Sequence, residues 1–166
     1  MNVGVADLGT GLVVGLGNRD RGDDGVGPEV AARVTGLLPD VRVVEHEDPT
    51  SLMDLWAGED PVVIVDAVRS GHHPGTLVVV EAGADAGPLP AEPWAPTGRG
   101  GTHALGLAAV LELARALDRL PRRVVVVGIE VAAVGHGVPM SAEVAAAVPA
   151  AVEAVVALAE PSGGGR

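Results

Sequence analysis

The chain has no cysteine, lysine, phenylalanine or tyrosine among its 166 residues. Without cysteine it has no disulfide and no thiol nucleophile. Without lysine it has no Schiff-base lysine, no Ser–Lys dyad and no Walker phosphate-binding loop. The serines, none of which lies in a Gly-x-Ser-x-Gly turn, are Ser51, Ser70, Ser141 and Ser162. A mechanism without a covalent enzyme intermediate is therefore favoured.

Positive charge is scarce too, because 11 arginines stand against 22 acidic residues and give a net charge of −11. Such a surface repels phosphate backbones, so a nucleic-acid partner is not expected. No run is expected to approach the roughly 18 apolar residues of a membrane span. The first ten residues lack the positive segment of a secretory signal. Together with the absence of cysteine, this pattern predicts a cytoplasmic protein without a membrane partner.

The hydrophobic residues, 48% of the chain, are mostly valine, leucine, alanine and isoleucine, and apolar runs alternate with helical patterns. This alternation predicts a three-layer α/β/α sandwich around a mostly parallel, twisted, five-stranded sheet. The expected domain spans residues 1–160, followed by a flexible tail at 161–166. Strands are expected at 11–17, from 41, at 61–67, 76–81 and 124–129. Helices are expected at 26–38, 50–56, 103–120 and 142–159, with Thr50, Thr102 and Ser141 as caps of the last three.

Three segments depart from this regular alternation. The link between the strands at 61–67 and 76–81 is too short for a parallel crossover, which predicts one antiparallel edge strand. Pro149 lies inside a helical pattern and predicts a kink or break there. Residues 83–101, rich in glycine, proline and alanine, are expected to form a long loop of the kind that is usually functional or disordered.

A glycine-rich turn at residues 15–27 joins the first expected strand to the first expected helix. Glycine allows the backbone to approach a ligand or a partner closely. The turn also carries two adjacent carboxylates, Asp23 and Asp24. Capping of the helix N-terminus explains one of them but not both, so at least one is expected to be functional. A dinucleotide site is not favoured, because the third glycine comes only at Gly22.

Two more side chains that can bind metal lie at the ends of expected elements. Asp66 ends a buried strand, and its alternative role is that of a turn residue satisfied by backbone N–H groups. His103 opens a helix, whose positive end favours neutral imidazole, and its alternative is a partly exposed first-turn residue. Since ligands gather at the carboxyl ends of parallel strands, Asp24, Asp66 and His103 are expected to converge. Two carboxylates and one imidazole suit a borderline divalent ion such as nickel or zinc.

The remaining histidines are weaker candidates. His72 and His73 lie in a turn and are expected to be solvated. His46 is flanked by Glu45 and Glu47, which predicts a local ion pair. His136 lies in a glycine-rich loop that can line a site, but it is not expected to be a ligand.

Six segments resemble the hydrogenase maturation proteases, the endopeptidases that trim the C-terminus of the large subunit of nickel–iron hydrogenases. They occur in the family's order at residues 15–18, 21–27, 63–67, 74–76, 102–107 and 127–130. The family's metal ligands match Asp24, Asp66 and His103. Val131 stands where the family usually has proline, and residues 83–101 have no clear family pattern.

The resemblance implies an aspartic-type endopeptidase that reads nickel already bound by the large-subunit precursor. Asp24, Asp66 and His103 would then serve both as metal contacts and as catalytic residues, with the general base left open between the two aspartates. Nickel would come with the substrate, and zinc or cadmium would be able to replace it in vitro. Cleavage lets the tail fold in and activates the hydrogenase. A monomer is expected.

Other functions fit parts of the pattern. Peptidyl-tRNA hydrolases also open with a strand followed by Gly-Leu-Gly-Asn, but they need a basic surface, which a net charge of −11 opposes. A second alternative is a non-catalytic nickel-binding or precursor-docking protein of the same fold. A third is a peptidase of this fold that acts on another metalloprotein.

Overall fold

Five valine-rich strands form the central sheet in the computed structural model, which describes residues 11–89 and 106–160. Every residue of β1 and β5 is buried, as expected for strands covered on both faces. The bounds of the strands are β1 Leu12–Leu16, β2 Arg42–His46, β3 Val62–Val68, β4 Leu77–Glu81 and β5 Val124–Glu130.

The strand order is β2-β1-β3-β5-β4. β1 pairs in parallel with β2 and β3, and β3 pairs in parallel with β5. β4 is the antiparallel edge strand that the short link predicts, but its partner is β5, which inserts between β3 and β4. The predicted fold class, with its five strands, is therefore confirmed.

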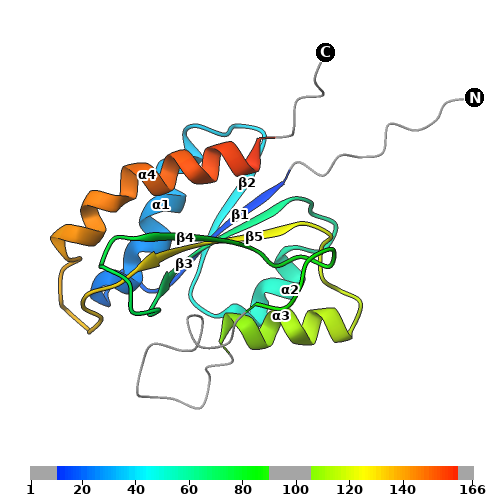
Figure 1. Cartoon of the computed structure of the whole chain (residues 1–166). Coiled ribbons are helices and arrows are strands. Elements are labelled where there is room, and N and C mark those ends of the chain that lie inside the picture. Colours follow the sequence, from blue (N-terminus) through cyan, green and yellow to red (C-terminus); the bar gives the residue numbers. More distant parts are fainter. Residues whose placement is uncertain (1–10, 90–105, 161–166) are drawn as a thin grey trace, which may run out of the picture.

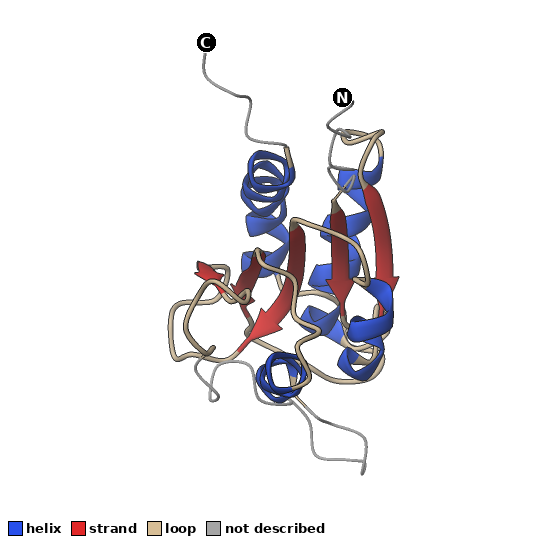
Figure 2. Cartoon of the chain, turned by 90° about the vertical axis from the view of Figure 1, so that its right-hand side faces the viewer, coloured by secondary structure: helices blue, strands red, loops and turns tan. Residues whose placement is uncertain are grey.

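Helices cover both faces of the sheet (Figures 1 and 2). Their bounds are α1 Val26–Thr35, α2 Leu52–Leu55, α3 Leu107–Ala116 and α4 Ala142–Ala159, with short 3-10 helices at η1 Gly22–Gly25 and η2 Pro49–Ser51. Buried residues of α1 and α4 pack with one face of the strands, and those of α2 and α3 pack with the other. The core thus consists of two apolar layers separated by the sheet.

Two helices end earlier than the sequence predicts. α1 stops at Thr35, and Leu37, which falls inside the predicted helix at 26–38, is 57% exposed. α3 stops at Ala116, and Leu117 is 52% exposed beside the positive φ of Asp118. In both helices the helical spacing of apolar residues therefore continues beyond the last helical residue.

The predicted Thr50 cap is wrong. The short helical segment starts at Pro49 with Asp48 as its N-cap, and the Asp48 carboxylate accepts a hydrogen bond from the Thr50 amide. The predicted break at Pro149 is also wrong, because α4 runs without interruption through this residue, while a kink there stays a prediction. The lost hydrogen bond is tolerated because α4 has residues in the apolar core on both sides of the proline.

The expectation that no segment approaches a membrane span is corrected by α4. By length and composition alone, this 18-residue helix is apolar enough to cross a membrane. Core helices pass the same test, and buried side chains of α4 pack against the sheet and α1. The buried third of the helix thus belongs to the apolar core.

Several predicted features lie outside the described residues. These are the helix start with Thr102 and His103, the loop from residue 90 onward and the tail at 161–166.

Candidate functional site

The strand order reverses its direction between β1 and β3. From β1 the chain crosses to β2 through α1 on one face, and from β2 it crosses to β3 through α2 on the other face. In open α/β sheets, ligands bind outside the carboxyl ends of the strands at such a reversal. Asp24 follows β1, and Asp66 lies in the last part of β3. The fold therefore brings both predicted carboxylates to the expected crevice.

Glycines allow the turn after β1 to pack tightly against the sheet. A Cβ atom at Gly15 would lie 2.4 Å from the Gly27 carbonyl oxygen, and one at Gly27 would lie 2.6 Å from the Val65 carbonyl oxygen. Gly17 has a φ of +134°, and a Cβ atom there would lie 1.9 Å from the Asp24 carbonyl oxygen. A larger residue at these positions would push Asp24 away from the ends of the strands.

The Asp24 carboxylate has a mixed environment. Burial raises its pKa, and the nearby charge of Glu47 raises it further. A hydrogen bond from the Asn18 amide, 3.0 Å from Oδ2, and the positive charge of Arg21 oppose this rise but do not cancel it. Asp24 is thus a partly buried carboxylate that accepts a proton more readily than an ordinary aspartate.

The pKa of Asp66 is raised more strongly than that of Asp24. Its side chain lies on the sheet face covered by α3, the face shared by Ile64 and Val68 in the alternation of β3. Burial holds its pKa well above the usual value, and the negative charge of Asp24 adds to the rise. The charge of Asp24 therefore acts on Asp66, which places the two carboxylates in the same part of the molecule.

His103, the third predicted ligand, lies outside the described residues. α3 leads back to the start of β5, so the N-terminus of α3 lies toward the carboxyl ends of the parallel strands (Figure 1). Within residues 11–89 and 106–160, no group of three or more histidine, aspartate or glutamate side chains is placed to hold a metal ion. A three-ligand set therefore needs a residue from elsewhere in the chain, for which His103 is the candidate from the sequence.

Asp23 has a structural role that the sequence did not reveal. Its side chain is fully buried and accepts hydrogen bonds from the amides of Ala132 (2.8 Å), Ala133 (2.8 Å) and Ser141 (2.7 Å), and from the Ser141 hydroxyl (3.0 Å). Burial alone would raise its pKa, but these hydrogen bonds outweigh burial and lower it. Asp23 therefore ties the glycine-rich turn to the loop between β5 and α4.

The structure also decides how the expected capping residues are used. Neither Asp23 nor Asp24 makes a side-chain cap, because Arg21 is the N-cap of η1 and Gly25 that of α1. Ser141 is the N-cap residue of α4, as predicted, but its hydroxyl makes no cap hydrogen bond and binds Asp23 instead.

Glu130, the last residue of β5, is a second buried carboxylate that sequence reasoning did not single out. It is 3% exposed and accepts hydrogen bonds from the amides of Ser70 and Gly71 and from the Ser70 hydroxyl. The signal that could have found it is the one used for Asp66, an acidic residue that ends a continuous apolar strand.

Polar side chains form the rim beside Asp24. Asn18 donates from its side-chain amide to Glu47 at 2.9 Å, and Arg19 binds Glu45 and Glu29. The predicted ion pair of His46 is wrong, since within the described part of the chain its Nδ1 is buried without a hydrogen-bond partner.

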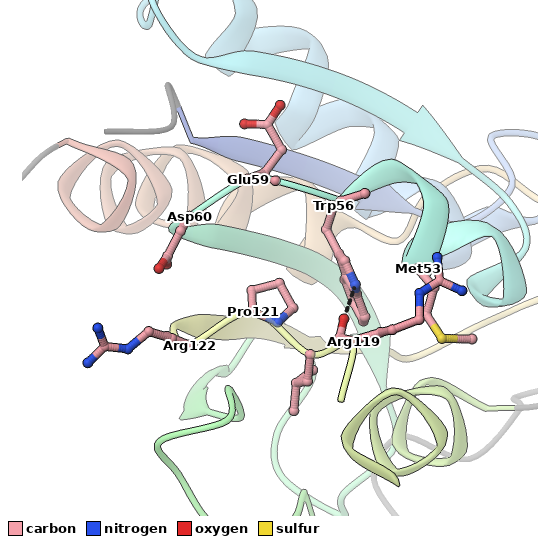
Figure 3. Close-up of a pocket in the computed structure, with 10 residues that line it drawn as sticks. Met53, Trp56, Glu59, Asp60, Arg119, Pro121 and Arg122 are labelled. Carbon is pink, nitrogen blue, oxygen red and sulfur yellow. Dashed lines mark hydrogen bonds between the residues drawn. The ribbon is translucent and has the colours of Figure 1, made fainter. Parts of the chain in front are cut away.

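A pocket of about 450 Å³ lies at the opposite edge of the sheet (Figure 3). Asp60 and Arg122, which line it, come just before β3 and β5, and its Trp56 side chain donates to the Arg119 carbonyl oxygen at 2.9 Å. Because it opens at the amino ends of the strands, this pocket is separate from the site of Asp24 and Asp66.

Comparisons with known proteins bear on the fold and the family of the chain. Residues 47–158 match the model of a family described as HycI, hydrogenase maturation protease. The structure is similar to the hydrogenase maturating endopeptidase HybD from E. coli, with 28% identity, a TM-score of 0.68 and coverage of 92% of this chain and 93% of that one. No curated protein sequence matches the chain.

Two other solved structures show the same similarity. An endopeptidase from Escherichia coli is 26% identical, with a TM-score of 0.70 and coverage of 92% of this chain and 93% of that one. The [NiFe] hydrogenase maturation protease HycI from Thermococcus kodakarensis is 25% identical, with a TM-score of 0.67 and coverage of 91% and 92%.

Proposed function

The chain belongs to the hydrogenase maturation protease family, and from this premise we propose that it removes a C-terminal extension from the nickel-loaded large-subunit precursor of a nickel–iron hydrogenase. The observation that carries the proposal is the pair Asp24 and Asp66 at the reversal of strand order. A rival reading as a peptidyl-tRNA hydrolase is set aside by the family match and by the net charge of −11.

In this proposal Asp24, Asp66 and His103 contact the nickel of the precursor. The carboxylate oxygens and the imidazole nitrogen suit this borderline ion. Nickel bound in the substrate polarises the scissile carbonyl group or a water molecule. A carboxyl group must lose its proton to bind metal, so the raised pKa of Asp66 makes nickel recognition weaken as the pH falls.

We assign the general base to Asp24. The hydrogen bond from the Asn18 amide and the charge of Arg21 favour its ionised form, whereas the charge of Asp24 itself disfavours ionisation of Asp66. Asp24 then takes a proton from the attacking water, whose oxygen bonds to the carbonyl carbon. As the C–N bond breaks, Asp24 returns this proton to the leaving amine, and no covalent enzyme intermediate forms.

The test is incubation of the purified protein with its cognate precursor, read by intact mass, with nickel-loaded and nickel-free precursor in parallel. We expect loss of a defined C-terminal peptide from the nickel-loaded form only. His103→Ala should abolish this loss while its circular dichroism spectrum stays that of the wild type. Binding of the precursor without cleavage by the wild type would instead indicate a docking protein, and normal cleavage by His103→Ala would overturn the assigned ligand.

Further parts of the proposal follow from the sequence. The protein acts in the cytoplasm as a monomer, and zinc or cadmium can take the place of nickel in vitro. Size-exclusion chromatography with light scattering tests the oligomeric state.

A further inference from the structure

The sheet has two free edges in the part of the chain that the structure describes, the outer sides of β2 and β4. A free edge presents unpaired backbone N–H and C=O groups, with which another extended chain can pair. β4 is the only antiparallel strand among the five, so it begins at the edge of the sheet where the other four strands end (Figure 1).

The two edges differ in the side chains that accompany them. β2 begins with the exposed Arg42 and carries the exposed Glu45, and charged side chains are a common means of blocking a sheet edge. β4 has four apolar residues before the single charge of Glu81, and Val79 at its centre is 51% exposed. The edge of β4 is therefore open to pairing, whereas the edge of β2 is blocked by charge.

Hydrogen bonds just outside β4 establish how its backbone is oriented. Before the strand, the Glu130 amide donates to the Thr76 carbonyl oxygen at 2.9 Å. After the strand, the Ala82 amide donates to the Val124 carbonyl oxygen at 2.7 Å. Both bonds continue the antiparallel register between β4 and β5.

The alternation of an antiparallel pair then assigns every residue of β4 to one side. Residues that bond the partner strand alternate with residues that do not. Between the two bracketing bonds, Val78 and Val80 therefore direct their backbone groups to β5. The residues that direct both N–H and C=O outward are Leu77, Val79 and Glu81.

This free edge starts beside the candidate site. Ile129 of β5 pairs with Ala67 of β3 on one side and with Leu77 of β4 on the other. Leu77 therefore lies level with the residue that follows Asp66. Two strand spacings separate β3 from β4, which is about 10 Å, and roughly three extended residues span that distance.

We propose that the outer edge of β4 binds the C-terminal extension of the precursor as an added strand. This inference rests on the proposed function, because it takes the extension as the occupant. The extension is a length of chain whose backbone groups are available to pair, and it leaves the site at the edge of the sheet where β4 begins. After about three residues it reaches Leu77, and the following residues run beside β4 toward Glu81. Backbone hydrogen bonds then hold the extension while it is cut.

The first experiment measures amide hydrogen exchange of the ¹⁵N-labelled protein by NMR, with a synthetic peptide of the extension's sequence as the probe. In the free protein, the amides of Val79 and Glu81 should exchange quickly, and those of Val78 and Val80 slowly. Millimolar peptide should slow Val79 and Glu81 at least about tenfold. Unchanged exchange of Val79 would overturn the proposal. Protection that appears without peptide and grows with protein concentration would also overturn it, because a second copy would then occupy the edge.

The second experiment compares Val79→Pro with Val79→Ala on the nickel-loaded precursor. Proline removes the outward N–H group, which the pairing of β4 with β5 does not use. We expect Val79→Pro to raise KM about three- to tenfold, the loss of one backbone hydrogen bond, with little change in kcat. Val79→Ala keeps the N–H group and should raise KM less. Circular dichroism spectra of both variants should match that of the wild type.

Shortening the extension tests the same contact without changing the enzyme. A nickel-loaded precursor whose extension is cut back to three residues should have a raised KM with the wild type. Val79→Pro should add nothing further on this substrate, because both changes remove the same pairing. If the wild type cuts full and shortened extensions with equal KM, this inference fails and the proposed function stands. If the wild type does not cut the nickel-loaded precursor at all, the proposed function fails, and this inference fails with it.

Discussion

Two neighbouring carboxylates in the same turn, Asp23 and Asp24, have opposite environments. Asp23 is fully buried and accepts four hydrogen bonds from the loop between β5 and α4, which lower its pKa. Asp24 accepts one hydrogen bond, from the Asn18 amide, and burial raises its pKa. Hydrogen bonding, rather than burial alone, therefore separates a carboxylate that holds the fold from one that stays available for chemistry.

The largest effect on cleavage is expected from removing the negative charge of Asp24. Asp24→Asn keeps the size of the side chain but removes the general base and a nickel contact. We expect cleavage of the nickel-loaded precursor to fall about 10²- to 10⁴-fold, measured by intact mass over time. The midpoint of urea unfolding should stay within error of the wild type. A variant that cuts at more than half the normal rate would contradict the role given to Asp24.

Asp23→Ala should produce the opposite result, a loss of stability. It removes the acceptor of three backbone amides and one hydroxyl, each hydrogen bond contributing about 0.5–1.5 kcal/mol, or more to a charged group, so we expect the free energy of unfolding to fall by about 3 kcal/mol. Urea denaturation measures the change. Asp40→Ala, at an exposed surface position, is the control and should stay near the wild type. Unchanged stability of Asp23→Ala would show that the hydrogen bonds of Asp23 are dispensable.

The pH dependence of stability should separate Asp66 from Asp23. The pKa of Asp66 is raised in the folded state, so its contribution to stability is complete at low pH and is lost as the pH rises through the folded-state value. Asp66→Asn removes this loss, so the variant should gain stability relative to the wild type between pH 5 and pH 8. Urea unfolding at both pH values measures the difference.

For Asp23 the sign is reversed, because its folded-state pKa is lowered and its contribution is lost as the pH falls. The advantage of the wild type over Asp23→Ala should therefore shrink in acid. If the stability of both variants relative to the wild type changed with pH in the same direction, the opposite pKa shifts of Asp66 and Asp23 would be contradicted.

The smallest effect is expected at the rim. Glu47→Gln keeps an acceptor for the Asn18 side-chain amide but removes the negative charge that raises the pKa of Asp24. An exposed charge of this kind is worth about 0–1 kcal/mol, so cleavage at neutral pH should change less than about fivefold. The acidic limb of the pH–rate profile should move to lower pH, and a shift to higher pH would contradict the effect assigned to Glu47.

Much of the fold was predictable because the central strands β1, β3 and β5 are almost entirely apolar and the short link before β4 favoured an antiparallel edge strand. Helix ends were not, since the apolar side chains Leu37 and Leu117 continue the helical period beyond the last helical turn and are exposed. The spacing of apolar residues indicates which side chains suit a helix. Where the helix ends depends instead on the backbone conformation, as at Asp118 with its positive φ.

The candidate site was predictable only in part. Strand ends and the glycine-rich turn located Asp24 and Asp66, and the structure brings these two together, while the roles of both and of His103 stay predictions. The partners of Asp23 could not be read from the sequence, because they lie on a loop distant along the chain. The hydrogen bonds of Glu130 to Ser70 and Gly71 were hidden for the same reason.

The hydrogen bonds of Asp23 also impose an order on biosynthesis. Its partners are separated from it by 109, 110 and 118 positions, so they leave the ribosome on the order of ten seconds after the turn itself. Until they dock, nothing in that loop fixes the turn that carries Asp24. A nascent chain thus contains the turn before it contains the groups that hold the turn in place, and the last of these groups is the residue directly before its final helix.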